Sequence, residues 1–532
     1  MTPSPISAAN DAKAADDWAA ASAPAFHTIA KNVTTRYIAI TTEMLVGLLT
    51  LPINLHYLGK EAYGVWMLTG SLMVHFSLLD MGFGGALVKF IAQYRAQRNA
   101  RALNEIASTL FFVFTAVGVV AYLVTIALAF NLQHLFRLTP EEVYTGRWIL
   151  LIIGLNVALN FPFSIFGGVV AGFQRYDANN VVAVCSSILA GAIGVGVLLL
   201  GYGVVAVVAS STAVRVGAYF LYRLNAYRIY PPLSVRWSLF RRNRLREVTG
   251  FSVYTSIIDW ANKLNYQLDE FVIGAFMGAA PVAVWAVADR VISATQRLTN
   301  QLNGVLFPVV VESDVTNRQS RLQRVLLEGT RLSLATVLPI AIVLIVLARP
   351  LVRAWVGQKM IESASVIQIL AFAVAFRVGN ATGTTLLKGS GKVRYLAIVN
   401  IVTGIVNLAL SAVLVRPFGL EGVAWGTLAP IAFSSMFLLF PAACRRVELP
   451  VLHAVRSAIW PTVWPAVVCG LLLLATSRIS SGTLLAVLVQ AAGAGLVYEI
   501  LFFGLAVGRT DRAQYAGKLK QLLRRPRLAP AA

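Results

Sequence analysis

The chain has 532 residues, of which 58% are hydrophobic and only 13% are charged, and its mean hydropathy is +0.72. A soluble domain carries about 25% charged residues, so this composition excludes an ordinary soluble protein and indicates a membrane protein. The net charge of +22 does not predict nucleic-acid binding, because Lys and Arg are concentrated in alternate loops between apolar stretches, as the positive-inside rule requires.

The first 30 residues are rich in Ala, Ser and Pro and lack the apolar core of a signal peptide. They predict a disordered cytoplasmic tail in residues 1–30. The first span then serves as an uncleaved insertion signal. The loop charges place both termini in the cytoplasm.

Apolar stretches long enough to cross a bilayer core, about 20 helical residues each, follow one another along the rest of the chain. Each must be helical, because backbone amides find no water to bond inside lipid. The second and eighth stretches exceed one crossing, so we expect them to tilt, kink or protrude. The predicted spans are 37–55, 63–92, 107–130, 148–171, 180–200, 204–222, 250–277, 282–310, 332–348, 363–387, 395–415, 420–441, 459–476 and 484–507.

An internal repeat organises these spans. The segment from Tyr57 to Trp66 resembles the segment from Phe276 to Trp285, and each ends in Val-Trp. Three glycine pairs recur at nearly constant offsets of 219, 217 and 216 positions: Gly59 with Gly278, Gly172 with Gly389, and Gly203 with Gly419. Repeats of six helices share one orientation, so the two copies would be related by a pseudo-twofold axis along the membrane normal.

The predicted fold is therefore an all-α polytopic membrane protein of about 14 transmembrane helices, with two pseudo-twofold-related six-helix lobes plus two C-terminal helices. Its six segments are a disordered tail (1–30), an N-terminal lobe (31–222), a basic cytoplasmic linker (223–249), a C-terminal lobe (250–443), two additional spans (444–507) and a basic cytoplasmic tail (508–532). We expect the arginines of the linker mainly to set topology and to contact anionic lipid.

Nothing in the sequence predicts an enzyme, a metal site or a cofactor. The three cysteines are an odd number and indicate no disulfide framework. The five histidines are scattered, and neither a nucleophile elbow nor a phosphate-binding loop is found.

Ionisable residues within the spans are the strongest functional signal. Each would cost roughly 3 kcal/mol at a lipid-facing helix centre, so most of them must face protein or water. Ten of the thirteen belong to spans one, two, seven and eight. The set is Glu43, Asp80, Lys89, Arg215, Asp259, Lys263, Asp269, Glu270, Asp289, Arg290, Arg297, Arg377 and Glu499.

Helical spacing arranges these charges in polar stripes, such as Arg36, Glu43, Gly47, Thr50 and Asn54 in span one. Such stripes in both halves predict two lobes facing a shared hydrated cavity. Substrate-contacting residues are then predicted at Lys263, Arg290, Arg297, Asn54 and Asn300, since arginine makes bidentate bonds to anions such as phosphate.

Structural explanations compete with that interpretation. Asp259 and Lys263 are four residues apart and could neutralise each other. Asp289 and Arg290 point in different directions and could pair with other helices. Arg377 is isolated in the sequence, which favours structural pairing or snorkelling.

Several of these residues resemble a known family. Leu58–Trp66, Leu78–Phe83 and Ala86–Lys89 are similar to the N-terminal signature of polysaccharide flippases, the O-antigen and exopolysaccharide exporters of the multidrug/oligosaccharidyl-lipid/polysaccharide exporter superfamily. Asp269 followed by Gly274 resembles the pattern that opens their C-terminal lobe. The likeness covers residues 33–440.

The resemblance implies a flippase that carries an undecaprenyl-diphosphate-linked oligosaccharide across the bacterial inner membrane by alternating access. Membrane lipids and the polysaccharide polymerase machinery are the implied partners. Relatives use a cation or the membrane potential, and the acids that would serve here are Glu43, Asp80, Asp269 and Glu270. The mixed sign of the charged stripes departs from a purely basic diphosphate clamp.

Two other functions stay open at this point. One is a cation-coupled multidrug or small-molecule exporter of the same fold, for which an acidic, aromatic pocket without paired arginines would be expected. The other is a membrane-embedded scaffold or polymerase partner, which would not translocate a lipid-linked glycan.

Overall fold

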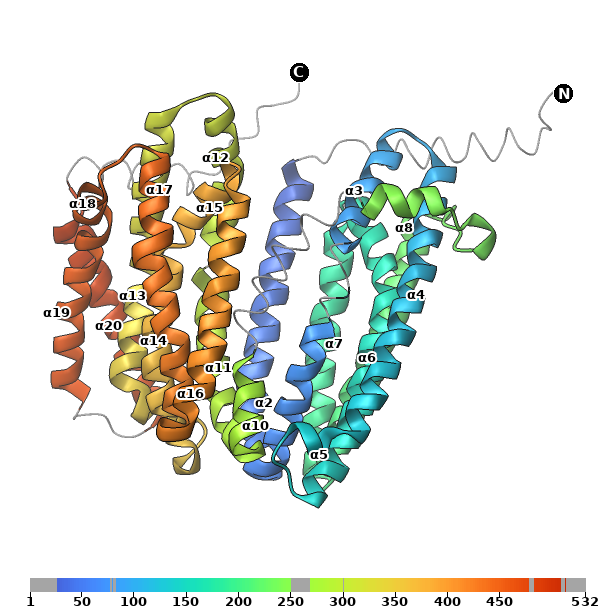
Figure 1. The fold of residues 1–532 in the computed structure, drawn as a ribbon, viewed down its shortest axis with the longest axis horizontal. Coiled ribbons are helices and arrows are strands. Elements are labelled where there is room, and N and C mark those ends of the chain that lie inside the picture. Colours follow the sequence, from blue (N-terminus) through green and yellow to red (C-terminus); the bar gives the residue numbers. More distant parts are fainter. Residues whose placement is uncertain are drawn as a thin grey trace. The chain divides into compact units, whose positions relative to one another are not determined.

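The computed structural model describes residues 26–76, 79, 83–249, 268–299, 301–477, 483–508 and 512. Every regular element in these ranges is a helix, coloured along the chain in Figure 1. Contacts divide the chain into two compact units, Met1–Ala286 and Val287–Ala532.

The first unit is built from long helices packed side by side. Its elements are α2 (Phe26–His75), α3 (Phe83–Ala96), α4 (Ala100–Phe130), the short α5 (Leu132–Leu135), α6 (Pro140–Gly172), α7 (Tyr176–Leu199), α8 (Val204–Ile229), the 3₁₀ turn Trp237–Leu239, α10 (Asp269–Met277) and the first residues of α11 (Ala279–Thr299).

The second unit continues from α11. Its elements are α12 (Gln301–Val315), α13 (Gln319–Trp355), the 3₁₀ turn Gln358–Met360, α14 (Ser363–Gly379), α15 (Ala381–Gly389), α16 (Val393–Phe433), α17 (Phe440–Arg446), α18 (Val451–Ala454), α19 (Trp460–Ser477) and α20 (Leu484–Leu501). Short π-helical stretches cover Ser434–Leu439, Val455–Ile459 and Phe502–Ala506.

Ten helices in the described ranges are long and apolar enough to cross a membrane. Two of them each join two spans across a glycine with non-helical torsions, α2 at Gly59 and α16 at Gly419. The fold is therefore all-α and polytopic, as predicted. Each of the two overlong predicted spans contains residues outside the described ranges, between Phe76 and Phe83 and at Asn300.

Unusual backbone turns recur at the offset of the sequence repeat. Four pairs of residues with positive φ are separated by 219, 219, 217 and 218 positions. The pairs are Gly59 (77°) with Gly278 (90°), Arg98 (53°) with Asn317 (51°), Gln174 (61°) with Gly391 (75°), and Gly201 (83°) with Gly419 (57°).

Helix boundaries follow the same offset. The starts of α4 and α13 are 219 positions apart, at Ala100 and Gln319. Both α6 and α15 end in glycine, at Gly172 and Gly389, 217 positions apart. The next helix begins four residues later in each case, so the two halves repeat their helices and turns together.

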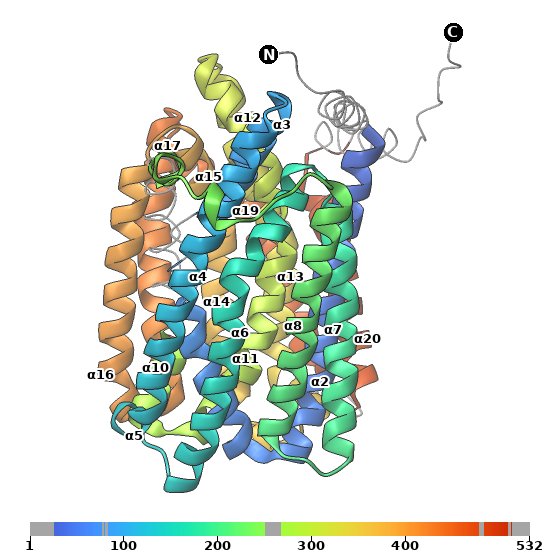
Figure 2. The same ribbon diagram turned by 90° about the vertical axis from the view of Figure 1, so that its right-hand side faces the viewer.

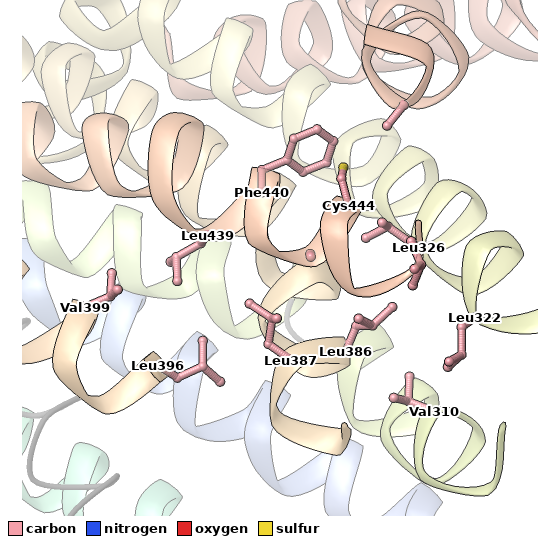
Figure 3. Close-up of a cluster of buried hydrophobic side chains, with 13 residues drawn as sticks. Val310, Leu322, Leu326, Leu386, Leu387, Leu396, Val399, Leu439, Phe440 and Cys444 are labelled. Carbon is pink, nitrogen blue, oxygen red and sulfur yellow. The ribbon is translucent and has the colours of Figure 1, made fainter. Parts of the chain in front are cut away.

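Apolar side chains fill the spaces between helices within each unit. In the second unit, one buried cluster joins α12, α13, α15, α16 and α17, with Leu326, Leu386 and Phe440 near its centre (Figure 3). The thiol of Cys444 is fully buried in the same cluster. This cysteine therefore acts as a small apolar core residue.

The start of the second repeat packs within the first unit. The ring of Phe271 on α10 meets that of Phe136 edge-on, with centroids 5.2 Å apart. The amide of Arg137 donates to the carbonyl of Gly274 at 3.3 Å. The closest approach is at Gly64 of α2, where an added Cβ would lie 2.0 Å from the carbonyl oxygen of Ala279. Only glycine fits there.

The segment after α8 is docked on the first unit along one face of α4. Asn104 donates through Nδ2 to the carbonyl of Pro232 at 3.0 Å, and its Oδ1 accepts from the amide of Ser234 at 3.0 Å. One turn further, Thr109 Oγ1 accepts from the amide of Arg241 at 3.0 Å. Backbone groups of the predicted linker are therefore hydrogen-bonded to side chains in the first turns of α4.

A buried carboxylate anchors this docked segment. Glu105 is 7% exposed and lies 3.2 Å from a nitrogen of Arg244, 3.2 Å from Arg101 and 3.8 Å from Arg241. Arg244 also pairs with Glu247 at 3.2 Å. Two of the basic residues expected to act through topology and lipid thus have protein partners.

Tyr94 on α3 extends the same network. Its hydroxyl donates to Glu247 at 2.9 Å. Burial and this hydrogen bond raise the pKa of Tyr94 to about 12. The phenol therefore keeps its proton throughout the physiological range, and the hydrogen bond to Glu247 does not depend on pH there.

We expect Gly64→Ala to destabilise the protein by roughly 1–3 kcal/mol, because the new methyl overlaps the Ala279 carbonyl and must push the helices apart. Gly70→Ala is the matched control on the same helix, since a Cβ there meets nothing within 4 Å. The measurement is the thermal unfolding midpoint of the detergent-purified protein. Equal midpoints for the two variants would contradict the close contact.

We expect Glu105→Gln to loosen the docked segment, because the arginines around it lose their carboxylate. The cost should be roughly 2 kcal/mol, less than for a fully buried pair because Arg101 and Arg241 reach solvent. Trypsin should cleave faster after the arginines at 241–246 in the detergent-purified variant. Glu141→Gln, at an exposed glutamate with no role in this network, should cleave as the wild type does.

Candidate functional site

The predicted substrate-contacting residues fall in both units. Arg290 and Arg297 lie on α11 in the second unit, whereas Asn54 lies on α2 in the first and is 8% exposed. Lys263 and Asn300 lie outside the described residues. Arg290 and Arg297 therefore lie together in the second unit, whereas Asn54 lies in the first.

The two arginines belong to a charge cluster centred on Asp289. Ser293, one turn along α11, donates its hydroxyl to Asp289 at 3.2 Å. Arg290, Arg297 and also Arg377 of α14 lie close enough to act electrostatically on the carboxylate. Arg290, Ser293 and Arg297 share one helix face. We call Asp289, Arg290, Arg297 and Arg377 the α11 cluster.

The α11 cluster brings three guanidinium groups near one carboxylate, on which each acts electrostatically. Arg297 is exposed, while Arg290 and Arg377 are half-buried. Guanidinium groups suit bidentate binding of phosphate or diphosphate.

Arg377 is the member of the cluster to which sequence reasoning gave only a structural role. It is 88 positions from Asp289, and the two meet because α11 and α14 belong to the same unit. Structural pairing, one of the two interpretations favoured for it, agrees with this position. The feature of the sequence that could have indicated Arg377 as a member of the cluster is its position in the last turn of an apolar helix.

The polar stripe of α2 does not act as one surface. Arg36 and Glu43 are exposed. The methyl group of Thr50 faces α7 and would lie 3.5 Å from a Cβ on Gly191. Asn54 is buried. The outer part of the stripe is accessible, and its inner part is used for helix packing.

The acids predicted for ion coupling are separated in the same way. Asp269 and Glu270 are half-buried in the first turn of α10. Acidic residues there are stabilised by the helix dipole, which is a sufficient structural reason for their presence. Glu43 is exposed on α2, and Asp80 lies outside the described residues.

Comparison with known proteins identifies the family. Residues 57–365 match the sequence family described as polysaccharide biosynthesis protein. This match covers more than half of the chain. The chain belongs to that family.

Two relatives are similar to this chain over most of its length. An uncharacterized membrane protein of Methanocaldococcus jannaschii is 22% identical over 64% of this chain and 69% of its own length. A protein named probable flippase AglR, of Haloferax volcanii, is 22% identical over 79% of this chain and 84% of its own.

Solved structures show the same fold. The lipid II flippase MurJ in an inward closed conformation superposes with a TM-score of 0.71 at 14% identity, over 88% of this chain and 98% of its own. An inward-facing multidrug transporter of the MATE family reaches 0.61 at 16% identity, over 76% and 94%. At these identities the likeness concerns the fold alone.

Some of the candidate residues lie inside the range that matches the family, and others lie outside it. Asp289, Arg290 and Arg297 fall inside residues 57–365, as do Asp269 and Glu270. Arg377, by contrast, lies beyond the matched range, and so do the polar residues of α2 from Arg36 to Asn54. Asp289, Arg290 and Arg297 of the α11 cluster therefore lie within the part of the chain that matches the family.

We expect Asp289 and Arg377 to be energetically coupled. Asp289→Asn and Arg377→Gln should each lower stability, and the double variant should lose less than the sum by about 0.5–3 kcal/mol, as residues in one charge network do. Thermal unfolding of the four purified proteins measures the difference. Glu362→Gln, exposed at the start of α14, should add independently to Asp289→Asn; additivity of Asp289 with Arg377 would refute the cluster.

Proposed function

We propose that this protein is a flippase that moves a lipid-linked oligosaccharide across the bacterial inner membrane during surface or exopolysaccharide biosynthesis. The lipid carrier would be undecaprenyl diphosphate, and both termini would lie in the cytoplasm. Membership of a polysaccharide biosynthesis family and the fold of a lipid flippase support this assignment.

The observation that carries the proposal is the grouping of three arginines in the α11 cluster. A diphosphate has adjacent anionic groups, and the paired arginines of α11 would bind it through charge-assisted hydrogen bonds. Asp289 would keep these arginines oriented when no substrate is bound, and would moderate the affinity so that the product leaves. The lipid tail would stay in the bilayer while the sugars pass through a hydrated path.

Energy coupling belongs to the same proposal. Glu43, Asp80, Asp269 and Glu270 would be the acids that exchange a proton or sodium ion during the cycle. Asp269 and Glu270 are the pair best suited to this role, because two neighbouring carboxylates share one helix turn. The polymerase machinery would receive the translocated glycan as a partner.

The MATE transporters of the same fold support an alternative function, a cation-coupled exporter of small molecules. Arginine-rich clusters disfavour cationic drugs, since like charges repel. A deletion strain that became drug-sensitive while its surface polysaccharide stayed normal would favour the exporter.

We expect Arg290→Gln and Arg297→Gln each to slow translocation at least about tenfold, because each removes a charge-assisted bidentate contact. The assay follows a fluorescent undecaprenyl-diphosphate oligosaccharide in proteoliposomes. Arg290→Lys, which keeps the charge but not the fork of donors, should fall between wild type and Arg290→Gln.

Arg353→Gln is the matched control, since among the described residues this exposed arginine of α13 binds only Gln358, at 2.9 Å, and it should transport normally. Wild-type rates in both α11 variants would refute the site assignment. A wild-type protein that moves no labelled glycan would refute the proposed function and favour a scaffold.

A further inference from the structure

The first unit contains a cavity of about 190 Å³ between α2, α6, α7 and α8, which is lined by both polar and apolar side chains. These four helices lie side by side in Figure 2 and pack against one another. The cavity is remote in sequence from the α11 cluster. Its polar wall includes Arg36, Asn160, Asn179, Asn180, Tyr219 and Tyr222.

One wall residue has a buried acceptor that the protein does not satisfy. Asn179 donates through Nδ2 to the carbonyl of Gly167 at 3.0 Å, which fixes the orientation of its amide. Its Oδ1 is then buried with no hydrogen-bond partner in the described part of the chain. A buried acceptor of this kind is costly, but the atom has almost no accessible surface, so it is not itself a contact for an occupant.

Three further polar groups around the cavity lack protein partners. The side chains of Arg36, Asn160 and Tyr222 make no hydrogen bond or ion pair with any residue that the structure describes. Arg36 and Asn160 are exposed at the wall. Polar groups within spans need water or a ligand, and these three lie around one space.

The rest of the wall is held rigid. Asn180 is 5% exposed and donates to Thr35 Oγ1 at 3.1 Å. Tyr219 donates to Asn156 Oδ1 at 2.9 Å, and the ring of Phe163 stacks on it with centroids 5.8 Å apart. Side chains fixed by the protein present their remaining polar atoms without reorganisation, which favours binding.

The depth of the cavity matches a headgroup. Asn179 and Asn180 lie in the first turns of α7, which begins at Tyr176. The amide of Asn32 on α2 donates to the carbonyl of Gln174 at 2.8 Å, so α2 and the α6–α7 turn meet at this end. The end of a span is where phosphate headgroups lie.

The charge around the cavity favours an anion. Asp177 is the nearest acid along α7, and it is already held by Lys31 at 2.8 Å and Arg175 at 3.1 Å. Arg36 therefore keeps its positive charge for an occupant. Guanidinium binds phosphate oxygens bidentately, while the amides and the phenol can bond to hydroxyl groups.

We propose that this cavity binds a phosphate ester that also carries hydroxyl groups, with the phosphate on Arg36 and the hydroxyl groups on Asn160 and Tyr222. This site goes beyond the proposed function, because it lies within the first unit and requires no transport. Two lipids share the chemistry: phosphatidylglycerol of the bilayer, and a polyprenyl phosphate that bears a sugar.

Native mass spectrometry of the full-length purified protein tests the site with three probes. These are phosphatidylglycerol, a polyprenyl phosphate carrying one hexose, and phosphatidylcholine, whose headgroup lacks hydroxyl groups. We expect one or both of the first two to bind at least about tenfold more tightly than phosphatidylcholine, since they add hydroxyl hydrogen bonds and lack the cationic choline group beside the phosphate. The tighter of the two identifies the source.

Variants localise the binding. Arg36→Gln should weaken it about tenfold and Tyr222→Phe about threefold, as loss of a charged and a neutral hydrogen bond does. Ala183→Leu should also weaken it, because it fills the wall without changing charge. Arg223→Gln is the control on α8, since this guanidinium lies over the rings of Phe166 and Tyr227.

Tyr222→Phe preserves the ring, so it keeps the test valid if a larger change impairs folding. The proposal is overturned if phosphatidylcholine binds as tightly as both other probes. It is equally overturned if Tyr222→Phe, Arg36→Gln and Ala183→Leu all bind as the wild type does, or if Arg223→Gln weakens binding as much as Arg36→Gln.

Discussion

An ionised carboxylate in or beside a membrane span is strongly unfavourable unless cations hold it. Three acids of this protein meet that condition in the same way. Glu105 lies among three arginines, Asp177 between a lysine and an arginine, and Asp289 near three arginines. At Glu105 and Asp177 the paired cations outnumber the acid, so each location fixes its helices and still carries residual positive charge. The excess of basic residues in the composition is thus used inside the fold as well as in the loops.

The consequences of this pairing differ between the three sites. Around Glu105 the cations come from the segment after α8, so compensation docks a connecting segment on α4. Around Asp177 they come from α2 and the α6–α7 turn, so it closes one end of a helix bundle. Around Asp289 they come from two long helices, and Arg297 stays exposed. Under the proposed function, the arginines of α11 contact the anionic substrate.

Much of the fold was predictable from hydropathy, because a span that lacks water must be a helix of sufficient length. Two of the three glycine pairs also predicted the repeat, since Gly59 and Gly278 both adopt positive φ and Gly172 and Gly389 both end a helix. The third pair was wrong by two positions, because the turn that corresponds to Gly419 is at Gly201, whereas Gly203 has a φ of −81°. The docking of the linker was not predictable. Asn104, Ser108 and Thr109 are ordinary polar residues in sequence, and their role depends on which backbone groups reach them.

The candidate sites were predictable to a smaller degree. Arg290 and Arg297 followed from helical spacing, but their grouping with Arg377 depends on tertiary packing that spacing does not encode. The cavity around Arg36 was missed for the same reason. Asn160 and Tyr222 each look like a single polar residue in an apolar helix, and only the packing of four helices places them on one wall.

The paired turns carry a record of ancestry that side chains have lost. Gln174 and Gly391 occupy equivalent turns, as do Arg98 and Asn317, yet no residue-by-residue comparison would match them. What the two halves retain is the left-handed torsion itself, which a chain of L-residues adopts reluctantly. The backbone torsions at these turns have therefore been retained where the residue types have not. Comparing torsions between the halves of a chain can detect a gene duplication that sequence alignment no longer detects.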